Sequence, residues 1–209
     1  MPTKKIIIFV FILFASFSQF VLAKTDNNKS ELTVEADESL EWFEKEKYYL
    51  AKGNVILKKD GVTLKANTVK ADYVLQNGEN ILKKIIAKEK VILTKENTIA
   101  TGQYMTYDLE DKIARISGPF QTFSSPSGYV ESKKNIIFDD VNNKAEAEGN
   151  VKIILSNKTV IYADNVKADF ESTNKTLKKA IAKGNVIIEN KAKGRKSKAD
   201  LGVYNSDDE

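Results

Sequence analysis

Carboxylates are the side chains of this sequence best suited to acid–base chemistry, and they recur in a repeated setting. The 209-residue chain has 29 Asp and Glu residues but no histidine and no cysteine. This removes the commonest general base, the commonest zinc ligand and the usual nucleophile–base pairs. The acids that stand out follow alanine, at Asp37, Asp72, Asp169 and Asp200. A catalytic pair should be singular, whereas repeated outward acids favour solubility and turn geometry, so we predict no enzyme, no metal site and no cofactor.

The segments around these acids are themselves repeated. The pentapeptide A-K-G-N-V and its near copies occur at 51–55, 87–91, 147–151 and 182–186. A second motif, A-N-T-V-K-A-D-Y at 66–73, returns as A-D-N-V-K-A-D-F at 163–170. Matching positions are separated by a nearly constant offset of about 96 residues, which is typical of repeated supersecondary units. The sequence therefore predicts two tandem related halves.

Apolar and polar residues alternate with a period of two within these repeats. Val55 and Leu57 fall on one face of the first repeat, and Lys52 and Lys58 fall on the other. This alternation, with turn signals at short intervals, predicts an all-β fold of roughly 12–16 short antiparallel strands. No segment after residue 23 has a convincing helical stripe, and the proline-containing stretch 117–127 is expected to be a loop or an irregular crossover.

The glycine inside each A-K-G-N-V motif needs a physical reason, because glycine weakens the interior of a strand. One interpretation is a bend or bulge, with alanine two residues earlier as a second small residue on the same face. The other is a simple turn at the Gly-Asn step. The sequence alone does not separate the two.

The N-terminal segment differs in kind from the rest. Lys4 and Lys5 precede an apolar run, and Val21 and Ala23 occupy the −3 and −1 positions of a cleavage site. This pattern predicts a signal peptide over residues 1–23, cleaved after Ala23, with an uncleaved anchor helix as the alternative. The remainder is then one domain over 24–204 and an acidic tail over 205–209.

The charge balance argues against a nucleic-acid partner. The formal net charge of +4 includes the two lysines of the signal peptide, so the exported chain is close to neutral. The lysines alternate with apolar residues, and we expect Lys52, Lys70 and Lys167 to face solvent and to resist edge aggregation. Without cysteine, an exported protein depends on core burial and its hydrogen-bonded backbone.

Two stretches carry a resemblance to a known family. The segment E-L-T-V-E-A-D-E-S-L-E-W at 31–42 and the hairpin-like segment from A-K-G-N-V to K-A-D-Y at 51–73 are similar to the OstA-like family of periplasmic lipopolysaccharide-transport proteins, which includes LptA. The resemblance implies an extended, V-shaped β-jellyroll with an apolar groove along its axis. The chain departs from the pattern at Glu89 and Lys90, where the Gly-Asn step is lost.

The resemblance also implies a function. Family members hold the acyl chains of lipopolysaccharide in the groove and link inner- and outer-membrane transport proteins that have related domains. They also associate head to tail, and the candidate edges here are the strands around 32–40 and 186–204. The expected groove residues are Leu32, Val34, Val55, Leu57, Val69, Tyr73, Val91, Leu93, Val151, Val166, Phe170 and Val186.

Two alternatives stay open from the sequence. A structural or adhesive β-solenoid would show the same repeats around a filled interior without a ligand. A chain that keeps its N-terminal segment would instead be the inner-membrane-anchored relative of the same transport family.

Overall fold

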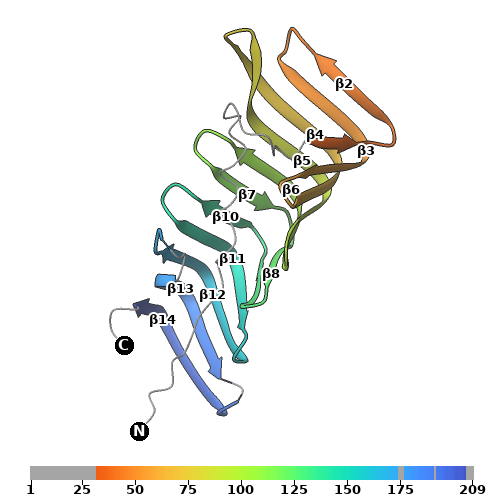
Figure 1. The fold of residues 1–209 in the computed structure, drawn as a ribbon. Coiled ribbons are helices and arrows are strands. Elements are labelled where there is room, and N and C mark those ends of the chain that lie inside the picture. The colour runs from red at the N-terminus through yellow and green to blue at the C-terminus, as the bar shows by residue number, and fades with distance from the viewer. Residues whose placement is uncertain (1–31, 174–176, 191, 206–209) are drawn as a thin grey trace.

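The computed structural model describes residues 32–173, 177–190 and 192–205, and these residues form a single sheet of 14 strands. Figure 1 shows the sheet as a long twisted ribbon, with the N-terminal strands at one end and the C-terminal strands at the other. The strands are β1 (Thr33–Glu35), β2 (Ser39–Phe43), β3 (Tyr48–Lys59), β4 (Val62–Gln76), β5 (Glu79–Lys95), β6 (Thr98–Asp108), β7 (Ile113–Ser117), β8 (Gln121–Ser125), β9 (Gly128–Ser132), β10 (Asn135–Asp139), β11 (Lys144–Leu155), β12 (Thr159–Phe170), β13 (Leu177–Asn190) and β14 (Arg195–Asn205).

Every strand pair in this sheet is antiparallel, which confirms the predicted all-β fold. The main path runs β1-β3-β4-β5-β6-β7-β10-β11-β12-β13-β14. Strand β2 adds to β3, while β8 pairs with β6 and β9, and β9 also pairs with β11. The sheet is continuous from end to end, and the two related halves stay a prediction from the sequence. Among the described residues, no helix has the length and apolarity needed to cross a membrane.

A line of β-bulges crosses the sheet at the Gly-Asn motifs. Between β3 and β4 the register shifts after Lys52, so that Gly53 and Asn54 together lie opposite Asn67. Gly53 and Asn54 have φ values of 82° and 43°, a left-handed conformation that glycine and asparagine tolerate. Corresponding shifts flank 89–90, 149–150 and 184–185. Of the two interpretations of the motif, the bulge is therefore right and the hairpin turn is wrong.

The bulge line divides the sheet into two arms. The β1 arm contains β1, β8 and β9 with the adjoining segments of the long strands, and the β2 arm contains β2, β7 and β10 with the segments on the other side. Small buried residues line the inner side of the bend, among them Ala51, Ala66, Ala87 and Ala147. Their size lets the backbones of the two arms approach each other at the bend.

The core lies between the two arms. Its largest fully buried side chains include Tyr107, Phe123, Met105, Ile116 and Ile136, which come from the central strands. One contiguous apolar cluster extends from the central strands toward both ends of the sheet. A flat sheet would leave this apolar face exposed to water. Folding along the bulge line brings the two arms together and buries it.

The outer face carries the lysines, as the alternation predicts. Lys52 pairs with Glu41 at 3.0 Å, Lys70 with Asp72 at 2.6 Å and Lys167 with Glu146 at 2.9 Å. The first and third of these pairs join neighbouring strands, and the second lies within β4. All three are partly exposed, so each contributes little to stability. Their charges keep the outer face soluble.

The four Ala-Asp acids occupy two kinds of position, which corrects their grouping as one motif. Asp37 lies at the bulge line, where its backbone N–H donates to the Gly53 carbonyl at 2.8 Å and its carboxylate accepts from Asn54. Asp200 lies opposite the bulge at 184–185. Asp72 and Asp169 lie far from the bend, in ion pairs with Lys70 and Lys144.

The stretch 117–127, predicted as a loop or an irregular crossover, contains the strand β8, so the loop prediction is wrong for Gln121–Ser125. Strand β7 ends at Ser117 and β8 spans Gln121–Ser125, so the residues outside strands are 118–120 and the turn at 126–127. At 118–120 the chain passes from the β2 arm to the β1 arm, so the crossover in the prediction is confirmed. Strand alternation in Q-T-F-S-S was masked by the serines and prolines on either side.

Candidate functional site

A wide opening between the two arms lies at the N-terminal end of the sheet. It is a groove of about 450 Å³, which lies within the range of about 300–1,000 Å³ that small-molecule pockets occupy. Its lining is mostly apolar and consists of Leu32, Val34, Leu40, Glu41, Trp42, Tyr49, Leu50, Ala51, Leu57, Val69, Ala71, Asn80, Leu82 and Ile85. Val34 and Leu57 come from the β1 arm, and Leu32 directly precedes β1. Most of the other lining residues come from the β2 arm.

The groove is open because the sheet ends here. Strand β2 has β3 on one side and no described strand on the other, so Leu40 and Trp42 are 63% and 58% exposed. Leu32 and Val34 are 37% and 38% exposed on the facing arm. Large apolar side chains gathered at one mouth of a fold are a recognised mark of a binding surface.

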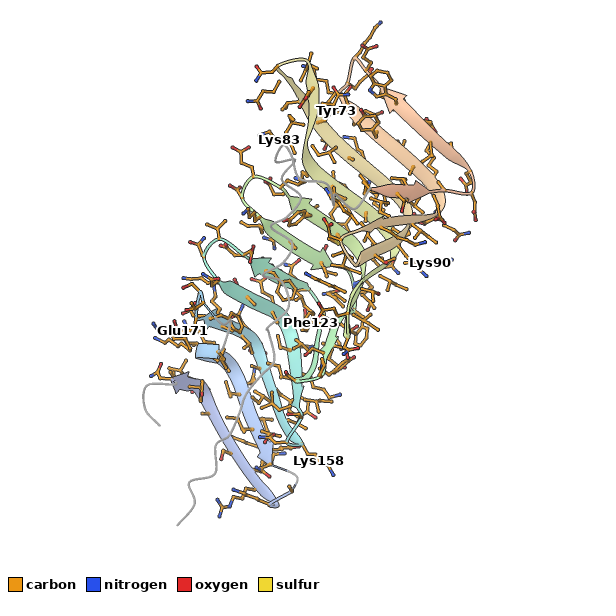
Figure 2. The ribbon with its side chains drawn as sticks, in the orientation of Figure 1. Tyr73, Lys83, Lys90, Phe123, Lys158 and Glu171 are labelled. Atoms are coloured by element: carbon orange, nitrogen blue, oxygen red, sulfur yellow. The ribbon has the colours of Figure 1, made fainter. Side chains whose placement is uncertain are left out.

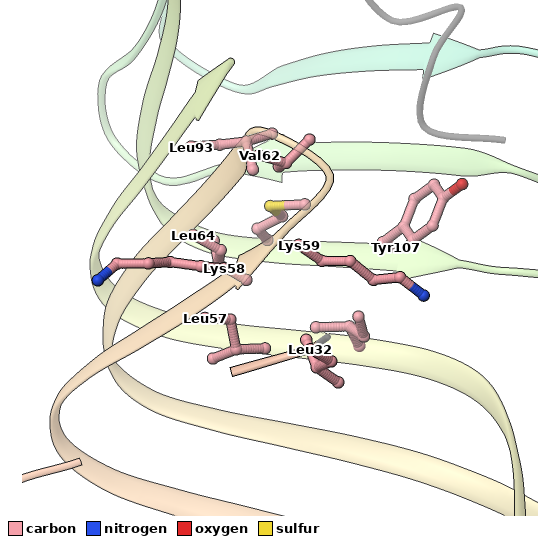
Figure 3. Close-up of a pocket in the computed structure, with 10 residues that line it drawn as sticks. Leu32, Leu57, Lys58, Lys59, Val62, Leu64, Leu93 and Tyr107 are labelled. Carbon is pink, nitrogen blue, oxygen red and sulfur yellow. The ribbon is translucent and has the colours of Figure 1, made fainter. Parts of the chain in front are cut away.

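The groove narrows toward the middle of the molecule. A cavity of about 20 Å³ adjoins it and shares Leu32, Leu57 and Ile85 with it. Figure 3 shows this narrow end, with Val62, Leu64 and Leu93 packed around it and Tyr107 beside it. A space of this size holds about one water molecule, so it is too small for a lipid chain.

The structure gathers only part of the predicted groove set at the groove itself. Leu32, Val34, Leu57 and Val69 line it, and Leu93 lines the small cavity. The others lie in the core or packed beside it: Val55, Tyr73, Val91, Val151, Val166, Phe170 and Val186. The alternation therefore placed all of them on the inner side, but it could not separate groove wall from filled core.

Several groove residues were missed from the sequence. Leu40, Trp42 and Tyr49 belong to the groove wall, and Leu82 and Ile85 complete it. The signal was present in S-L-E-W-F, which alternates with a period of two. Four charged residues at 44–47, which form the turn between β2 and β3, interrupt the alternation.

The charge at the rim is fixed by hydrogen bonds. Hydrogen bonds from the Ser39 hydroxyl, at 2.6 Å, and from the Lys52 ammonium lower the pKa of Glu41. Glu41 is therefore a carboxylate at neutral pH, and Lys52 neutralises it. The lining of the groove is thus mostly apolar, and its one charged residue, Glu41, is paired with Lys52.

The sequence of this part of the chain matches a known family. A family model described as LptA/(LptD N-terminal domain) LPS transport protein matches residues 33–128. Residues 33–128 are therefore similar in sequence to this family. The matched region contains every groove residue except Leu32, which directly precedes it. This LptA/LptD N-terminal match confirms the family that the sequence motifs indicated, and it is a match to transport proteins rather than to enzymes.

Comparison with other proteins adds context. No curated protein matches the chain. A solved structure, titled as LptH from Pseudomonas aeruginosa, the LptA homologous periplasmic component of the lipopolysaccharide transport device, is similar over 81% of this chain and 94% of its own. The sequence identity is 12% and the TM-score is 0.31.

Proposed function

We propose that this protein is a periplasmic lipopolysaccharide carrier that holds acyl chains in the groove between its two arms. The observation that carries the proposal is the open apolar groove within the region that matches the transport family. Burial of an acyl chain contributes about 0.8 kcal/mol per methylene, so several methylenes against this wall give useful affinity. The paired charges at the rim leave the groove without an uncompensated charge that would oppose an alkyl chain.

The two edges of the sheet support a bridging role. Strands β1 and β2 pair only with β3, and β14 pairs only with β13, among the described strands. Unpaired strand edges add further strands readily, and a head-to-tail contact that does not close forms an open filament. We propose that these edges join copies of the chain to each other and to inner- and outer-membrane transport proteins with related domains.

Export to the periplasm is part of the same proposal. The signal-peptide motif over 1–23 and its cleavage after Ala23 lie outside the described residues, as do the tail residues 206–209. N-terminal sequencing of the periplasmic protein should begin at Lys24. Recovery of the intact N-terminus in the membrane fraction would instead favour the membrane-anchored relative.

A ligand-free structural role is the second candidate, and the filled centre of the fold favours it. Phe123, Ile116, Val130 and Ile136 are all fully buried there. In a protein without a ligand, the large apolar side chains of Trp42 and Leu40 would stay exposed to water at the open end of the groove without any function. The two candidates differ in one measurable respect, namely whether glycolipid enters the groove.

Site-specific photo-crosslinking tests this directly. A photoreactive residue at Val34, Leu40 or Tyr49 replaces a side chain that is already part-exposed, so the fold should tolerate it. Each of these sites should capture lipopolysaccharide in cells. Matched sites on the outer face, at Lys52 and Lys70, should not. Equal capture on both faces, or capture on neither, contradicts the carrier proposal.

A further inference from the structure

Three aromatic rings meet at the end of the groove that is remote from the bend. The Trp42 and Tyr49 rings stack with centroids 6.3 Å apart, and the Tyr49 and Tyr73 rings lie 5.0 Å apart at an angle of 33°. Trp42 comes from β2, Tyr49 from β3 and Tyr73 from β4, so three neighbouring strands build the cluster. Figure 2 shows Tyr73 near the outer ends of these strands. We call Trp42, Tyr49 and Tyr73 the rim aromatics.

Hydrogen bonds fix the orientation of these rings. The Trp42 indole N–H donates to the Tyr73 hydroxyl at 2.8 Å, and the Asn80 amide donates to the Tyr49 hydroxyl at 2.7 Å. Trp42 is nevertheless 58% exposed, although Tyr73 beneath it is only 5% exposed. A large ring held in one orientation with its face in water has little conformational entropy left to lose when a ligand binds.

The rim aromatics lie at the boundary between an apolar and an aqueous environment. Trp42 and Tyr49 line the groove together with Leu40, while the polar residues Glu41 and Asn80 line it at the same end. Trp and Tyr are the side chains that suit such a boundary, because one part of each is apolar and the other part forms hydrogen bonds. The occupant that fits is amphiphilic, with its alkyl part toward the bend and its polar part at the rings.

The residues that line the groove offer no partner for a phosphate, because they include no lysine or arginine. Glu41 alternates with Leu40 and Trp42 along β2, so its carboxylate lies on the opposite face of the strand, where it pairs with Lys52 at 3.0 Å. An uncharged saccharide needs no cationic partner, and the slightly positive C–H face of a pyranose suits the negative face of an aromatic ring.

We propose that the rim aromatics bind the saccharide part of an acylated glycolipid, with a sugar ring stacked on the exposed face of Trp42. The Asn80 amide and the Tyr49 hydroxyl supply hydrogen-bonding groups for the sugar hydroxyls at the edge of the rings. This inference rests on the proposed carrier function and adds to it the orientation of the lipid. The alkyl chains lie toward Leu57 and the sugar lies toward Trp42.

Trp42 is the single tryptophan of the chain, so its fluorescence reports on this site alone. Three probes separate the contributions: lipid A, myristic acid, and a glucosamine disaccharide without phosphates or acyl chains. Lipid A should shift the emission of the wild-type protein strongly. The disaccharide should produce a saturable shift at higher concentration, and myristic acid should produce a small one.

Variants then separate stacking from simple apolar contact. Trp42→Leu keeps an apolar side chain but removes the ring, so calorimetry should show lipid A binding about three- to tenfold more weakly and myristic acid binding unchanged. Leu40→Ala is the matched control on the same strand, and it should weaken both ligands by the same factor. Circular dichroism of both variants checks the fold.

Each other outcome overturns the inference. Equal weakening of lipid A and myristic acid in Trp42→Leu would make the ring an apolar wall only. An unchanged affinity for lipid A would remove it from the site altogether. An emission shift that follows protein concentration without any ligand would mean that a second copy covers the ring. If lipid A and myristic acid both fail to bind the wild-type protein, the carrier proposal fails, and the disaccharide titration still decides whether the rings bind a sugar.

Discussion

The rings of Phe123 and Phe138 meet across the two arms, with centroids 5.3 Å apart and planes inclined at 49°. Phe123 is on β8 in the β1 arm, and Phe138 is on β10 in the β2 arm. Both are buried, and this contact marks the filled centre of the fold. The groove at the N-terminal end therefore does not continue past this point unless the arms move apart.

Replacement of Phe123 by alanine should lower the free energy of unfolding by about 3–5 kcal/mol, because it removes a fully buried ring and leaves a cavity. Urea unfolding followed by circular dichroism measures this change. Phe120→Ala is the matched control, because Phe120 is 49% exposed and should change stability by about 0.5 kcal/mol or less. Similar losses in both variants would contradict a core held by the Phe123–Phe138 contact.

The bulge glycines give a second prediction. A Cβ at Gly53 would lie 2.5 Å from Glu38 Cγ and 2.9 Å from the Glu38 backbone nitrogen, and φ is +82°. Gly53→Ala therefore adds a clash to the backbone strain. At Gly61, φ is +76° but no atom lies within 4 Å of such a Cβ, so Gly61→Ala should cost only about 1 kcal/mol for strain. Thermal unfolding should show the larger loss for Gly53→Ala, and equal losses would contradict a close approach at the bend.

At 89–90, where the Gly-Asn step of the motif is lost, a substitution that restores this step should raise stability rather than lower it. Glu89 and Lys90 have φ values of 62° and 53°, which glutamate and lysine adopt at a cost. The double replacement Glu89→Gly with Lys90→Asn restores the motif and should raise stability by about 1 kcal/mol, even though it removes the exposed contact from Asn67 to Glu89. Lys88→Gly, one residue earlier in regular strand, should lower stability instead. A loss in both proteins would contradict the strain at 89–90.

The sequence predicted the parts of this fold that depend on local pattern. Alternation identified the inner face, and the Gly-Asn repeats marked the bulge line, although the sequence left a hairpin turn as an equal alternative. The choice depends on which strands pair, because a Gly-Asn step forms a turn when the chain reverses and a bulge when the ladder continues on both sides, as it does at Gly53. That information is nonlocal.

The site was harder to predict than the fold for a similar reason. Val55 and Val34 carry the same side chain on the same arm, yet Val55 is fully buried and Val34 is 38% exposed. Only the position of β1 at the edge of the sheet separates them. The rim aromatics come from three strands, so no spacing within the chain reveals that Trp42 and Tyr73 form a hydrogen bond.

Stability at alkaline pH should depend on Tyr107. Burial, with smaller contributions from Asp140 and Asp108, raises the pKa of Tyr107 from 10.0 to about 12. Between these values the unfolded chain releases the phenolic proton while the folded protein keeps it, so stability falls as pH rises. Tyr107→Phe should reduce this fall. Urea unfolding of both proteins below pH 10 and between pH 10 and 12 measures it, and identical pH dependence would contradict the raised pKa.

A single carboxylate placed in the groove should separate lipid binding from folding. Val34→Asp introduces a negative charge that an alkyl chain would have to bury, so binding of an acylated glycolipid should weaken by about tenfold or more. Because Val34 is already part-exposed, the variant should stay folded, unlike a charged replacement of the buried Val55. The matched control is Thr33→Asp, which places the same charge beside Lys58, the partner of Thr33 in the ladder. Full binding by Val34→Asp, or equal loss in both variants, would contradict a lipid site between the arms.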